Sequence, residues 1–195
     1  MQIRLAEAGD AGGIQAIYAR VVTETPISFE TEPPTAAEMN GRVDDTLPDH
    51  PWLVLDDGGR VLGYAYGHRF GDRAAYRWSV QCSIYVHADA RGRGAGRALY
   101  SALIAVLRAQ GYRQAFGGIA LPNPASVALH ESFGFEPVGV YRRVGWKLGA
   151  WHDVGWWQVP LAAGEGTPNP PVPVDRLPQG TLAAAAAAAL AGLRR

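Results

Sequence analysis

The segment Arg91-Gly92-Arg93-Gly94-Ala95-Gly96 joins a stretch with the alternation of a strand to one with the periodicity of a helix. Glycines at such a junction let backbone amides approach a ligand closely, because no Cβ atom intervenes. The amides of the first helical turn are unpaired and carry the positive end of the helix dipole. The sequence therefore predicts that this segment binds an anion such as a pyrophosphate.

Other interpretations of the glycine-rich segment require different residues. A Rossmann fingerprint, G-x-G-x-x-G, would need a third glycine where the chain has Arg97. A Walker P-loop would need Gly-Lys-Ser/Thr, which does not occur in the sequence. A plain glycine-rich turn with basic side chains stays open from the segment alone, so the flanking sequence has to decide.

The flanking sequence predicts an α/β order of elements. Strands are expected at residues 2–6, 52–55, 60–66, 76–86, 114–120, 136–143 and 152–160. Asp56-Asp57-Gly58-Gly59 predicts a hairpin turn between two of these strands. Helices are expected after Asp10 and over residues 95–109 and 123–133. A capping box of Thr35 and Glu38 predicts a further helix that ends before Pro48, preceded by a loop over residues 22–34.

A change of composition after Leu161 divides the chain. Residues 1–161 carry the strand and helix patterns and form the predicted domain. Residues 162–180 are rich in Pro and Gly, as in a flexible or extended linker. Residues 181–195 form an alanine-rich helix candidate with little apolar surface to bury, and short isolated helices are marginal in water. We therefore expect this tail to fray unless it docks.

The composition indicates neither a nucleic-acid partner nor a membrane. The 195 residues include 18 Lys+Arg and 18 Asp+Glu, and no basic block offers nucleic acid an electrostatic footprint. A single cysteine, Cys82, excludes an internal disulfide framework and fits a reducing compartment. The charged N-terminus does not resemble a signal peptide, and no stretch is long and apolar enough to span a bilayer. We expect a soluble cytoplasmic protein that binds neither nucleic acid nor membrane.

A second motif follows the glycine-rich segment and consists of Asn123-Pro124-Ala125-Ser126, Leu129-His130 and Gly134-Phe135. Together the two motifs resemble the acetyl-CoA signature of the GNAT N-acetyltransferase superfamily. Further segments resemble the phosphinothricin N-acetyltransferases of that superfamily. These segments are Ile27-Ser28-Phe29-Glu30-Thr31-Glu32-Pro33, Pro51-Trp52-Leu53-Val54, Ala75-Tyr76-Arg77-Trp78 and Trp151-His152-Asp153-Val154-Gly155-Trp156-Trp157-Gln158. The likeness extends from about residue 3 to residue 161.

The resemblance implies an α/β GNAT (acyl-CoA N-acyltransferase) fold, with a mixed central β-sheet flanked by helices. It implies an enzyme that moves an acetyl group from acetyl-CoA to the amine of a small amino-acid-like substrate, such as phosphinothricin, methionine sulfoximine or methionine sulfone. It implies no metal. By analogy with related proteins, a homodimer is expected, with the aromatic C-terminal strands as a possible interface.

The resemblance also assigns cofactor-binding residues. The backbone of Ile84, Tyr85 and Val86 would pair with the pantetheine arm. The pyrophosphate would meet the amides of Gly92, Arg93, Gly94, Ala95, Gly96 and Arg97. Arg91 and Arg93 would add charge at the phosphates, unless they are simply solvated loop arginines. Asn123 and Ser126 would reach the pantetheine amides, and Asn123 could cap its helix at the same time.

The catalytic candidates are His130, Gln81 and Tyr85. His130 occupies the position at which many GNAT proteins carry a tyrosine that acts as general acid. Gln81 replaces the glutamate that serves as general base in the phosphinothricin type, and a neutral amide cannot accept the amine proton. Because an α-amino group has a pKa of about 8, a minor neutral fraction still exists near neutral pH. We therefore expect a slower or more alkaline-dependent enzyme, a base supplied elsewhere, or a drift in function. His130 acting through a water is the substitute candidate.

The pair His152 and Asp153 is a weaker substitute, because adjacent residues on a strand point to opposite faces. For the substrate, the resemblance points to Phe29, Arg73 and Tyr76, with Tyr85 in the same pocket. A guanidinium such as that of Arg73 suits a carboxylate or phosphinate, although Arg73 could equally be an exposed turn residue. Cys82 is interpreted as strand packing, and Trp156 and Trp157 as sheet or interface bulk.

Two alternative functions remain from the sequence. One is an acetyltransferase for a protein N-terminus or another amine. The other is a catalytically weak acyl-CoA-binding sensor, which the neutral Gln81 favours.

Overall fold

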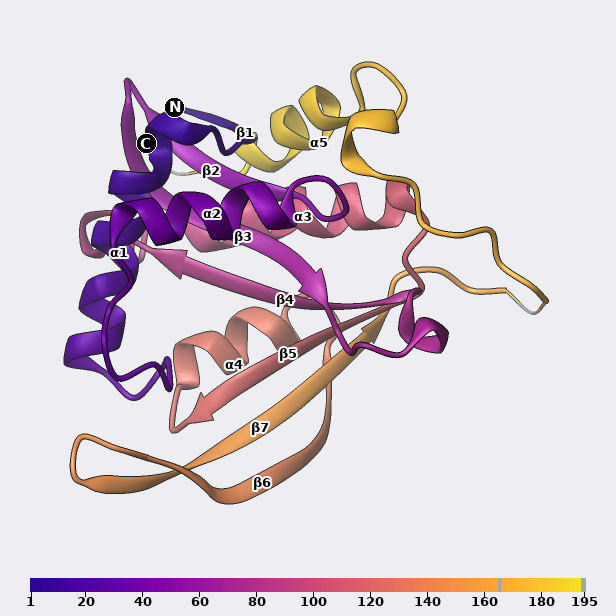
Figure 1. Cartoon of the computed structure of the whole chain (residues 1–195). Coiled ribbons are helices and arrows are strands. Elements are labelled where there is room, and N and C mark those ends of the chain that lie inside the picture. The colour runs from indigo at the N-terminus through magenta and orange to yellow at the C-terminus, as the bar shows by residue number, and fades with distance from the viewer. Residues whose placement is uncertain (165, 194–195) are drawn as a thin grey trace.

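The computed structural model describes residues 1–164 and 166–193. They form one seven-stranded mixed sheet with helices on both faces (Figure 1). The strands are β1 (Gln2–Leu5), β2 (Trp52–Asp57), β3 (Arg60–Arg69), β4 (Ser79–Val86), β5 (Gln114–Leu121), β6 (Glu136–Lys147) and β7 (Ala150–Pro160). The helices are α1 (Ala11–Glu24), α2 (Ala36–Thr46), α3 (Ala95–Gln110), α4 (Pro124–Glu131) and α5 (Thr181–Leu190). The predicted architecture, a mixed sheet flanked by helices, is confirmed. Residue 165 of the predicted linker and residues 194–195 of the predicted tail lie outside the described residues.

The sheet has the strand order β1-β2-β3-β4-β5-β7-β6 and splits in its middle. Strands β4 and β5 are parallel and pair from Ser79↔Gln114 to Gln81↔Phe116. Beyond Gln81, β4 runs on to Val86 and β5 diverges from it toward Leu121 (Figure 1). This divergence leaves one edge of β4 without a strand partner in the described part of the chain.

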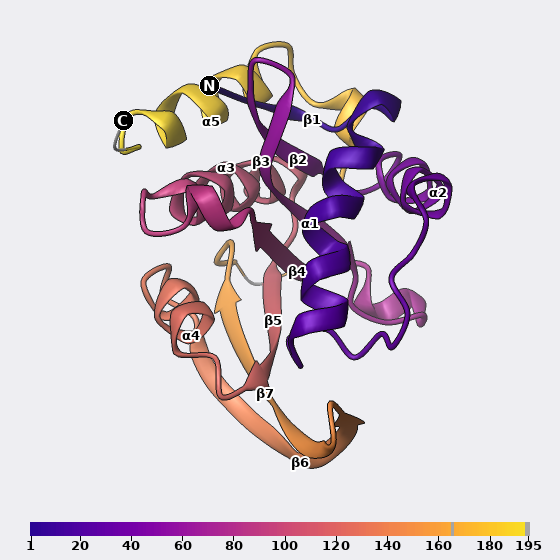
Figure 2. The same ribbon diagram turned by 90° about the vertical axis from the view of Figure 1, so that its left-hand side faces the viewer.

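Two apolar clusters cover the two faces of the sheet, as alternation along the strands requires. On β2, Leu53 and Leu55 belong to the cluster that includes α3, whereas Val54 belongs to the cluster that includes α1 and α2. Figure 2 shows α1 and α2 on one side of the sheet and α3 and α4 on the other. The sheet is therefore buried on both faces in its first half.

Several boundaries differ from the sequence-based expectation. β4 begins at Ser79, not at residue 76, because Ala74–Tyr76 forms a 3₁₀-helix. Hydrogen bonds from the amide of Tyr76 to the Arg73 carbonyl and from Nε of Arg77 to the Ala74 carbonyl close this turn. α1 extends to Glu24, into the expected loop, and β6 extends to Lys147.

The C-terminal helix is docked. α5 packs on α3 and β1, and Ala186 and Ala189 are buried in the same cluster as the α3 side chains. The extended segment before it is hydrogen-bonded to the body of the protein: Nε1 of Trp78 donates to the Asn169 carbonyl, and Nε2 of Gln110 donates to the Val172 carbonyl. The alanine-rich tail has more to bury than its composition suggests, because the small side chains allow close approach to α3.

No helix within residues 1–164 and 166–193 is both long and apolar enough to cross a membrane. The same residues contain no group of three or more His, Cys, Asp or Glu side chains arranged to hold a metal ion.

Candidate active site

A groove of about 420 Å³ runs along the unpartnered edge of β4. It is lined by residues of the loop after α1, of β4, of the glycine-rich segment, of the α3 N-terminus and of α4. The lining residues are Val21, Ile27, Ile84, Tyr85, Val86, Ala90, Arg91, Gly92, Gly94, Ala95, Gly96, Arg97, Asn123, Ala125, Ser126 and Leu129. The structure thus brings most of the predicted cofactor-binding residues into one groove.

The anion-binding end of the groove is the N-terminus of α3. Gly94 is the N-cap residue, with φ of 89°, and Gly92 has φ of 70°, a left-handed backbone that favours glycine. No side chain of the described residues caps this end of α3. Its amides and the positive end of the helix dipole therefore stay available to an anion.

The arginines of the segment occupy different places. Arg91 and Arg97 line the groove, and Arg97 is fixed by a 3.0 Å hydrogen bond to Ser132 Oγ. Arg93 instead lines a separate cavity of about 140 Å³ that includes Leu193 from the C-terminal tail. Of the two arginines expected at the phosphates, the structure places Arg91 against the groove and Arg93 outside it.

The middle of the groove is narrow and amphipathic. A Cβ atom on Gly96 would lie 3.6 Å from Val86 and 3.8 Å from both Ile84 and Leu129. Asn123 lines the groove while its Oδ1 accepts a hydrogen bond from the Ser126 amide, so it also caps α4. The glycine therefore keeps this passage open, and α4 begins directly beside it.

A smaller cavity of about 50 Å³ lies where β4 and β5 part. It shares Ile27, Ile84, Tyr85, Asn123 and Ser126 with the groove, so the two are neighbours. Its other lining residues are Cys82, Ser83, Gly118, Ile119, Ala120 and His130. The predicted catalytic residues Tyr85 and His130 thus meet at this cavity.

His130 is 3% exposed and is held in one tautomer. Its Nδ1 lies 2.8 Å from the Ser126 carbonyl oxygen, which can only accept, so Nδ1 carries the proton. Nε2 is then a lone-pair acceptor, and it has no hydrogen-bond partner among the described residues. Burial lowers the pKa of His130, which keeps the ring neutral. In this state the ring can accept a proton but cannot donate one from Nε2.

The His130 ring requires a glycine on β5. A Cβ atom on Gly117 would lie 2.6 Å from both Nε2 and Cδ2 of His130. Tyr100 and Phe135 each pack edge-on against the His130 ring, with centroids 4.9 and 5.1 Å from that of His130. The aromatic cage and the glycine together fix the position of the imidazole.

Tyr85 is a neutral phenol on the opposite face of β4 from Cys82. Burial raises the pKa of Tyr85 well above its ordinary value. The ring packs edge-on against Tyr18 of α1, with centroids 5.2 Å apart. Cys82 is 4% exposed in the α3 cluster, which confirms that it serves strand packing.

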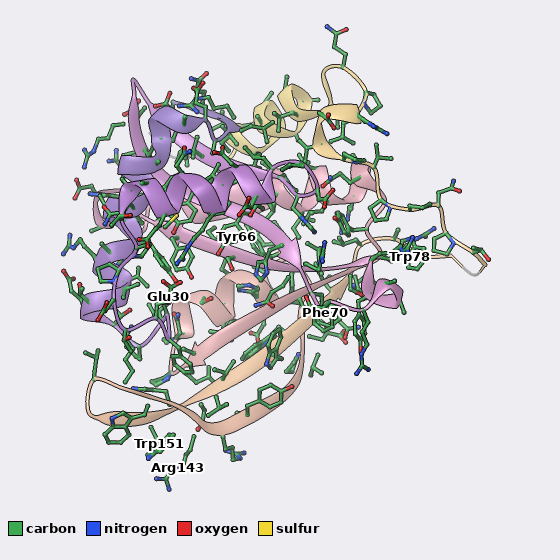
Figure 3. The ribbon with its side chains drawn as sticks, in the orientation of Figure 1. Glu30, Tyr66, Phe70, Trp78, Arg143 and Trp151 are labelled. Atoms are coloured by element: carbon green, nitrogen blue, oxygen red, sulfur yellow. The ribbon has the colours of Figure 1, made fainter. Side chains whose placement is uncertain are left out.

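The loop between α1 and α2 is tied to the site by a polar network that the sequence did not reveal. The Tyr18 hydroxyl lies 2.8 Å from both Ser28 Oγ and Glu30 Oε1. Arg42 of α2 donates to both carboxylate oxygens of Glu30 at 2.7 and 3.0 Å, which lowers the pKa of Glu30. Figure 3 shows Glu30 on this loop and Tyr66 on β3, both on the α1–α2 side of the sheet. No local sequence pattern predicts these pairings, because the partners are far apart in the chain.

Gln81 lies at the last β4–β5 pair and faces the α1–α2 side of the sheet. A Cβ atom on Gly118 would lie 3.6 Å from Gln81 Nε2 and 3.3 Å from Cη2 of Trp156. Trp156 therefore shares the face of Gln81, whereas Trp157 is 7% exposed on the opposite face, in the α3 cluster. The sequence-based interpretation grouped these two tryptophans; the structure separates them by the alternation of β7.

The predicted substrate residues are distributed over two places. The Phe29 ring packs on Gly145 near the tip of the β6–β7 hairpin and lies 6.4 Å from the His152 ring. Tyr76 packs edge-on against Phe70 at 5.6 Å, and exposed Arg73 precedes the same turn. Phe29 and Tyr76 therefore contact different neighbours, and a shared substrate pocket stays a prediction.

His152 and Asp153 are engaged at the hairpin tip. His152 Nε2 lies 2.9 Å from the Lys147 carbonyl, and Asp153 Oδ1 accepts a hydrogen bond from the Arg143 amide at 2.7 Å. Lys147 itself is 6% exposed and donates from Nζ to the Ser28 carbonyl at 2.6 Å. These contacts join the hairpin to the α1–α2 loop.

The residues present fit coenzyme A with its pyrophosphate at the α3 N-terminus. The uncapped amides supply anion binding, and the cleft over Gly96 suits a thin, amide-containing arm beside an unpartnered strand edge. His130 lines the small cavity next to the groove, and its buried Nε2 has no hydrogen-bond partner within the described residues.

Known proteins share this arrangement. The chain matches the model of the acetyltransferase (GNAT) domain over residues 3–156. A phosphinothricin N-acetyltransferase of Streptomyces viridochromogenes is 36% identical over 92% of this chain and 96% of that protein. An L-methionine sulfoximine/L-methionine sulfone acetyltransferase of Pseudomonas aeruginosa is 37% identical over 82% of this chain and 94% of that protein.

Solved structures agree with the sequence matches. The crystal structure of a phosphinothricin acetyltransferase from Sinorhizobium meliloti in complex with AcCoA has a TM-score of 0.83 to this chain at 39% identity, and the match covers 90% of this chain and 96% of the other. The resemblance inferred from the two motifs is thereby confirmed, and the chain belongs to the GNAT acetyltransferase family.

Proposed function

We propose that this chain transfers the acetyl group of acetyl-CoA to the α-amine of a small amino-acid-like substrate, of the phosphinothricin, methionine sulfoximine or methionine sulfone type. The observation that carries the proposal is the continuity of the site: the anion-binding α3 N-terminus and the groove along β4 lead to the cavity shared by Tyr85 and His130. The names of the relatives from Streptomyces and Pseudomonas support the substrate type.

Acetyl-CoA supplies an activated thioester when it is bound. The α3 amides and Arg91 hold its pyrophosphate, and the groove residues Ile84, Val86 and Asn123 hold its arm. The free edge of β4 offers backbone amides for the oxygen that gains negative charge during transfer. This assigns the glycine-rich segment and β4 to binding and orientation.

His130 acts as a proton acceptor in this proposal. Its tautomer leaves Nε2 with a lone pair, and its lowered pKa keeps that lone pair free of a proton at neutral pH. A water between Nε2 and the substrate amine would carry the proton, since His130 lines the cavity on the α4 side and Gln81 lies on the other face. Gln81 orients the amine without accepting its proton.

A thiol-release assay with acetyl-CoA tests the activity. Phosphinothricin, methionine sulfoximine, methionine sulfone and short peptides serve as acceptors, each measured from pH 6.5 to pH 9.5. We expect turnover with at least one of the free amino acids and a rate that rises with pH toward the pKa of the α-amine. Turnover with peptides alone would refute the substrate assignment. Tight binding of acetyl-CoA without thiol release for any amine would favour the sensor alternative.

We further propose a cytoplasmic homodimer that associates through β6. The β6 residues Val138, Val140, Tyr141 and Trp146 are between 42% and 61% exposed on an edge strand of the sheet. Exposed apolar residues on an edge strand favour association. The single, buried Cys82 is compatible with a reducing compartment. Light scattering after size-exclusion chromatography should give a dimer for the wild type and a monomer for Val138→Glu; a monomeric wild type would contradict the proposal.

A further inference from the structure

The α1–α2 loop carries Ser28, which is hydrogen-bonded through both its side chain and its carbonyl group. Its Oγ lies 2.8 Å from the Tyr18 hydroxyl of α1 and accepts a hydrogen bond from the Glu30 amide at 3.2 Å. Its carbonyl oxygen accepts a hydrogen bond at 2.6 Å from Nζ of Lys147, the last residue of β6. Ser28 is 7% exposed, so these bonds lie in the interior of the protein. The loop is therefore bound from two sides, by α1 and by the β6–β7 hairpin.

Ser28 lies between two residues that bear on the candidate active site. Ile27 lines both the cofactor groove and the small cavity beside His130, so it stands where the two meet. On the other side, the ring of Phe29, a predicted substrate residue, packs on the backbone of Gly145 in the hairpin. The peptide unit is planar and consecutive Cα atoms are a fixed distance apart. A displacement of the Ser28 carbonyl therefore also displaces its two neighbours in the chain.

The other polar contacts of the loop come from the opposite half of the sheet. Arg42 of α2 donates two hydrogen bonds to the Glu30 carboxylate, and the Tyr18 hydroxyl donates a third. Figure 3 labels Glu30 on this loop and Trp151 at the hairpin below it. Lys147 thus binds, from the hairpin, a loop that α1 and α2 bind from the other side of the split between β4 and β5.

Lys147 is a costly residue to place in the interior of a protein. It is 6% exposed, and burial lowers its pKa, an effect that the Glu30 carboxylate opposes. An ammonium group has three N–H donors, and within the described residues Nζ has one hydrogen-bond acceptor, the Ser28 carbonyl. Removing an ammonium from water costs free energy that a single carbonyl offsets only in part. Because an apolar side chain would avoid this cost, the position of the loop is a better reason for this lysine than stability alone.

We propose that Lys147 is a positioning residue for acetyl transfer, which acts by holding the Ser28 carbonyl in place. Ile27 is thereby fixed at the junction of the groove and the small cavity, and Phe29 is fixed against the hairpin. Lys147 itself lines neither the groove nor the small cavity, so it acts through the loop. The inference rests on the proposed acetyl transfer and adds to it a residue that fixes the surroundings of the reacting groups.

Two variants loosen the loop, and two others serve as controls. Lys147→Met removes the ammonium and keeps an unbranched side chain, so the Ser28 carbonyl loses its partner on the hairpin. Ser28→Ala removes the hydroxyl that faces Tyr18 and leaves the carbonyl in place. Arg142→Met removes a cation from the same strand, at a side chain that is 80% exposed, and controls for the change of charge. Ala186→Asp, on α5 far from the hairpin, controls for a loss of stability (Figure 1).

The thiol-release assay measures kcat/KM for the amine acceptor, and isothermal titration measures the Kd of coenzyme A. In Lys147→Met, kcat/KM should fall by about tenfold, because small misplacements around the reacting atoms are costly in rate. The Kd of coenzyme A should stay unchanged, since the α3 N-terminus and the edge of β4 are untouched. Lys147→Arg, which keeps a cationic donor, should lose less than Lys147→Met. Arg142→Met and Ala186→Asp should keep the kcat/KM of the wild type.

Hydrogen exchange followed by mass spectrometry gives a readout that does not depend on activity. The amides of residues 27–30 should exchange faster in Lys147→Met and in Ser28→Ala than in the wild type, because the loop then opens more often. The same amides in Arg142→Met and Ala186→Asp should exchange as in the wild type.

The outcomes separate this inference from the proposed function. Unchanged exchange or an unchanged kcat/KM in Lys147→Met would overturn the positioning role, and so would an equal loss of kcat/KM in Ala186→Asp. Should Lys147→Met fail to fold, wild-type exchange and wild-type kcat/KM in Ser28→Ala would overturn it. Faster exchange in Lys147→Met, together with a wild type that releases no thiol with any amine, would support the hold of Lys147 on the loop and refute the acetyl transfer.

Discussion

Gln81 and His130 approach the split between β4 and β5 from different sides, and their chemistry differs. Gln81 lies beside Gly118 on the α1–α2 face of the sheet and offers an amide, which stays neutral at every pH of interest. His130 lines the cavity beside Tyr85, and its Nε2 carries a lone pair. In the proposed reaction, proton removal from the amine therefore depends on His130 and not on the neutral amide of Gln81.

Gln81→Glu should raise the rate of acetyl transfer near neutral pH by roughly tenfold, because a carboxylate at this position can accept the amine proton directly. The rise of kcat/KM between pH 7 and pH 9 should become flatter than in the wild type. A pH series of the thiol-release assay measures both effects. An unchanged or lower rate at pH 7 would show that proton removal does not limit the wild type.

His130→Phe should lower kcat by about a hundredfold, which is the usual contribution of a general base. Phenylalanine keeps a ring between Tyr100 and Phe135 but loses the hydrogen bond from Nδ1 to the Ser126 carbonyl, so the melting temperature should fall by a few degrees and kcat is measured well below it. Because burial lowers the pKa of His130, the acidic limb of the wild-type pH profile should lie below pH 6.5. His50→Phe, at a histidine that stacks on Tyr112 outside the groove, is the control. Equal activity of His130→Phe and the wild type would remove His130 from the reaction.

At the residue scale, motifs predicted the cofactor side of the site much better than the acceptor side. Gly94, Asn123 and Ser126 belong to contiguous segments with fixed spacing, and the structure places them in one groove. Gly118 and Trp156 belong to different segments and become neighbours only when β5 pairs with β7. Pairing across a sheet is not encoded locally, so this neighbourhood could not be predicted from the sequence.

At the scale of elements, the structure shows that the C-terminal helix α5 is docked, which its alanine-rich sequence does not predict. Its alanines give it the highest helix propensity that a sequence can have, but a helix of this length is marginal in isolation. Ala186 and Ala189 lie buried against α3, and the Pro-rich segment before α5 is hydrogen-bonded to Trp78 and Gln110. Docking on α3 therefore stabilises the helix.

Ala186→Asp should reduce the free energy of unfolding by roughly 2–3 kcal/mol, because it buries a charge in the contact with α3. Ala187 is the next residue and is exposed, so Ala187→Asp should cost only the loss of helix propensity, about 0.5 kcal/mol. Denaturant unfolding of the two variants gives the difference. Equal stabilities would mean that α5 does not dock in solution.

Element boundaries were predictable where a capping residue or a turn marks them. The Thr35–Glu38 capping box begins α2 as expected, and the glycines after Asp57 turn the β2–β3 hairpin. The start of β4 was missed because residues 74–76 are apolar enough to continue a strand, whereas backbone hydrogen bonds close them into a 3₁₀-helix. In this segment the hydrogen-bonded turn therefore forms in place of an extension of the strand.

At the scale of the whole molecule, the two halves of the sheet meet at few backbone pairs. β4 and β5 are joined at the closed end of the split, up to Gln81↔Phe116. At the open end, the α1–α2 loop joins the β6–β7 hairpin through Phe29 on Gly145 and Lys147 on Ser28. Figure 3 labels Arg143 and Trp151 at the same hairpin, whose side chains form a cation–π pair at 5.8 Å. The split between β4 and β5 is therefore bounded at both ends by contacts between the two halves.

Histidines make the stability of the whole molecule sensitive to mild acid. Burial lowers the pKa of His50 from 6.5 to about 4, and it also lowers the pKa of His68 and His130. Between these pH values the unfolded chain binds protons that the folded protein does not, so the free energy of unfolding falls as the pH drops from 6.5 toward 4. Above pH 6.5 both states are neutral at these sites, and no change arises from them.

The shift at His50 corresponds to at most about 3 kcal/mol of stability lost across this window, and less where solvent reaches the ring. Urea unfolding at pH 7.5, 6.0, 5.0 and 4.5 measures the loss. His50→Phe keeps a ring against Tyr112 but cannot titrate, so its stability should depend less on pH than that of the wild type, with the remaining slope due to His68 and His130. Paired carboxylates such as Asp10 and Glu30 have lowered pKa values and stay ionised through most of this window, so their contribution is lost at lower pH. A stability that is constant from pH 7.5 to pH 5 would show that water reaches these imidazoles in the folded protein. In that case the pKa of His130 would not be lowered, and its proposed role as a neutral proton acceptor would be contradicted.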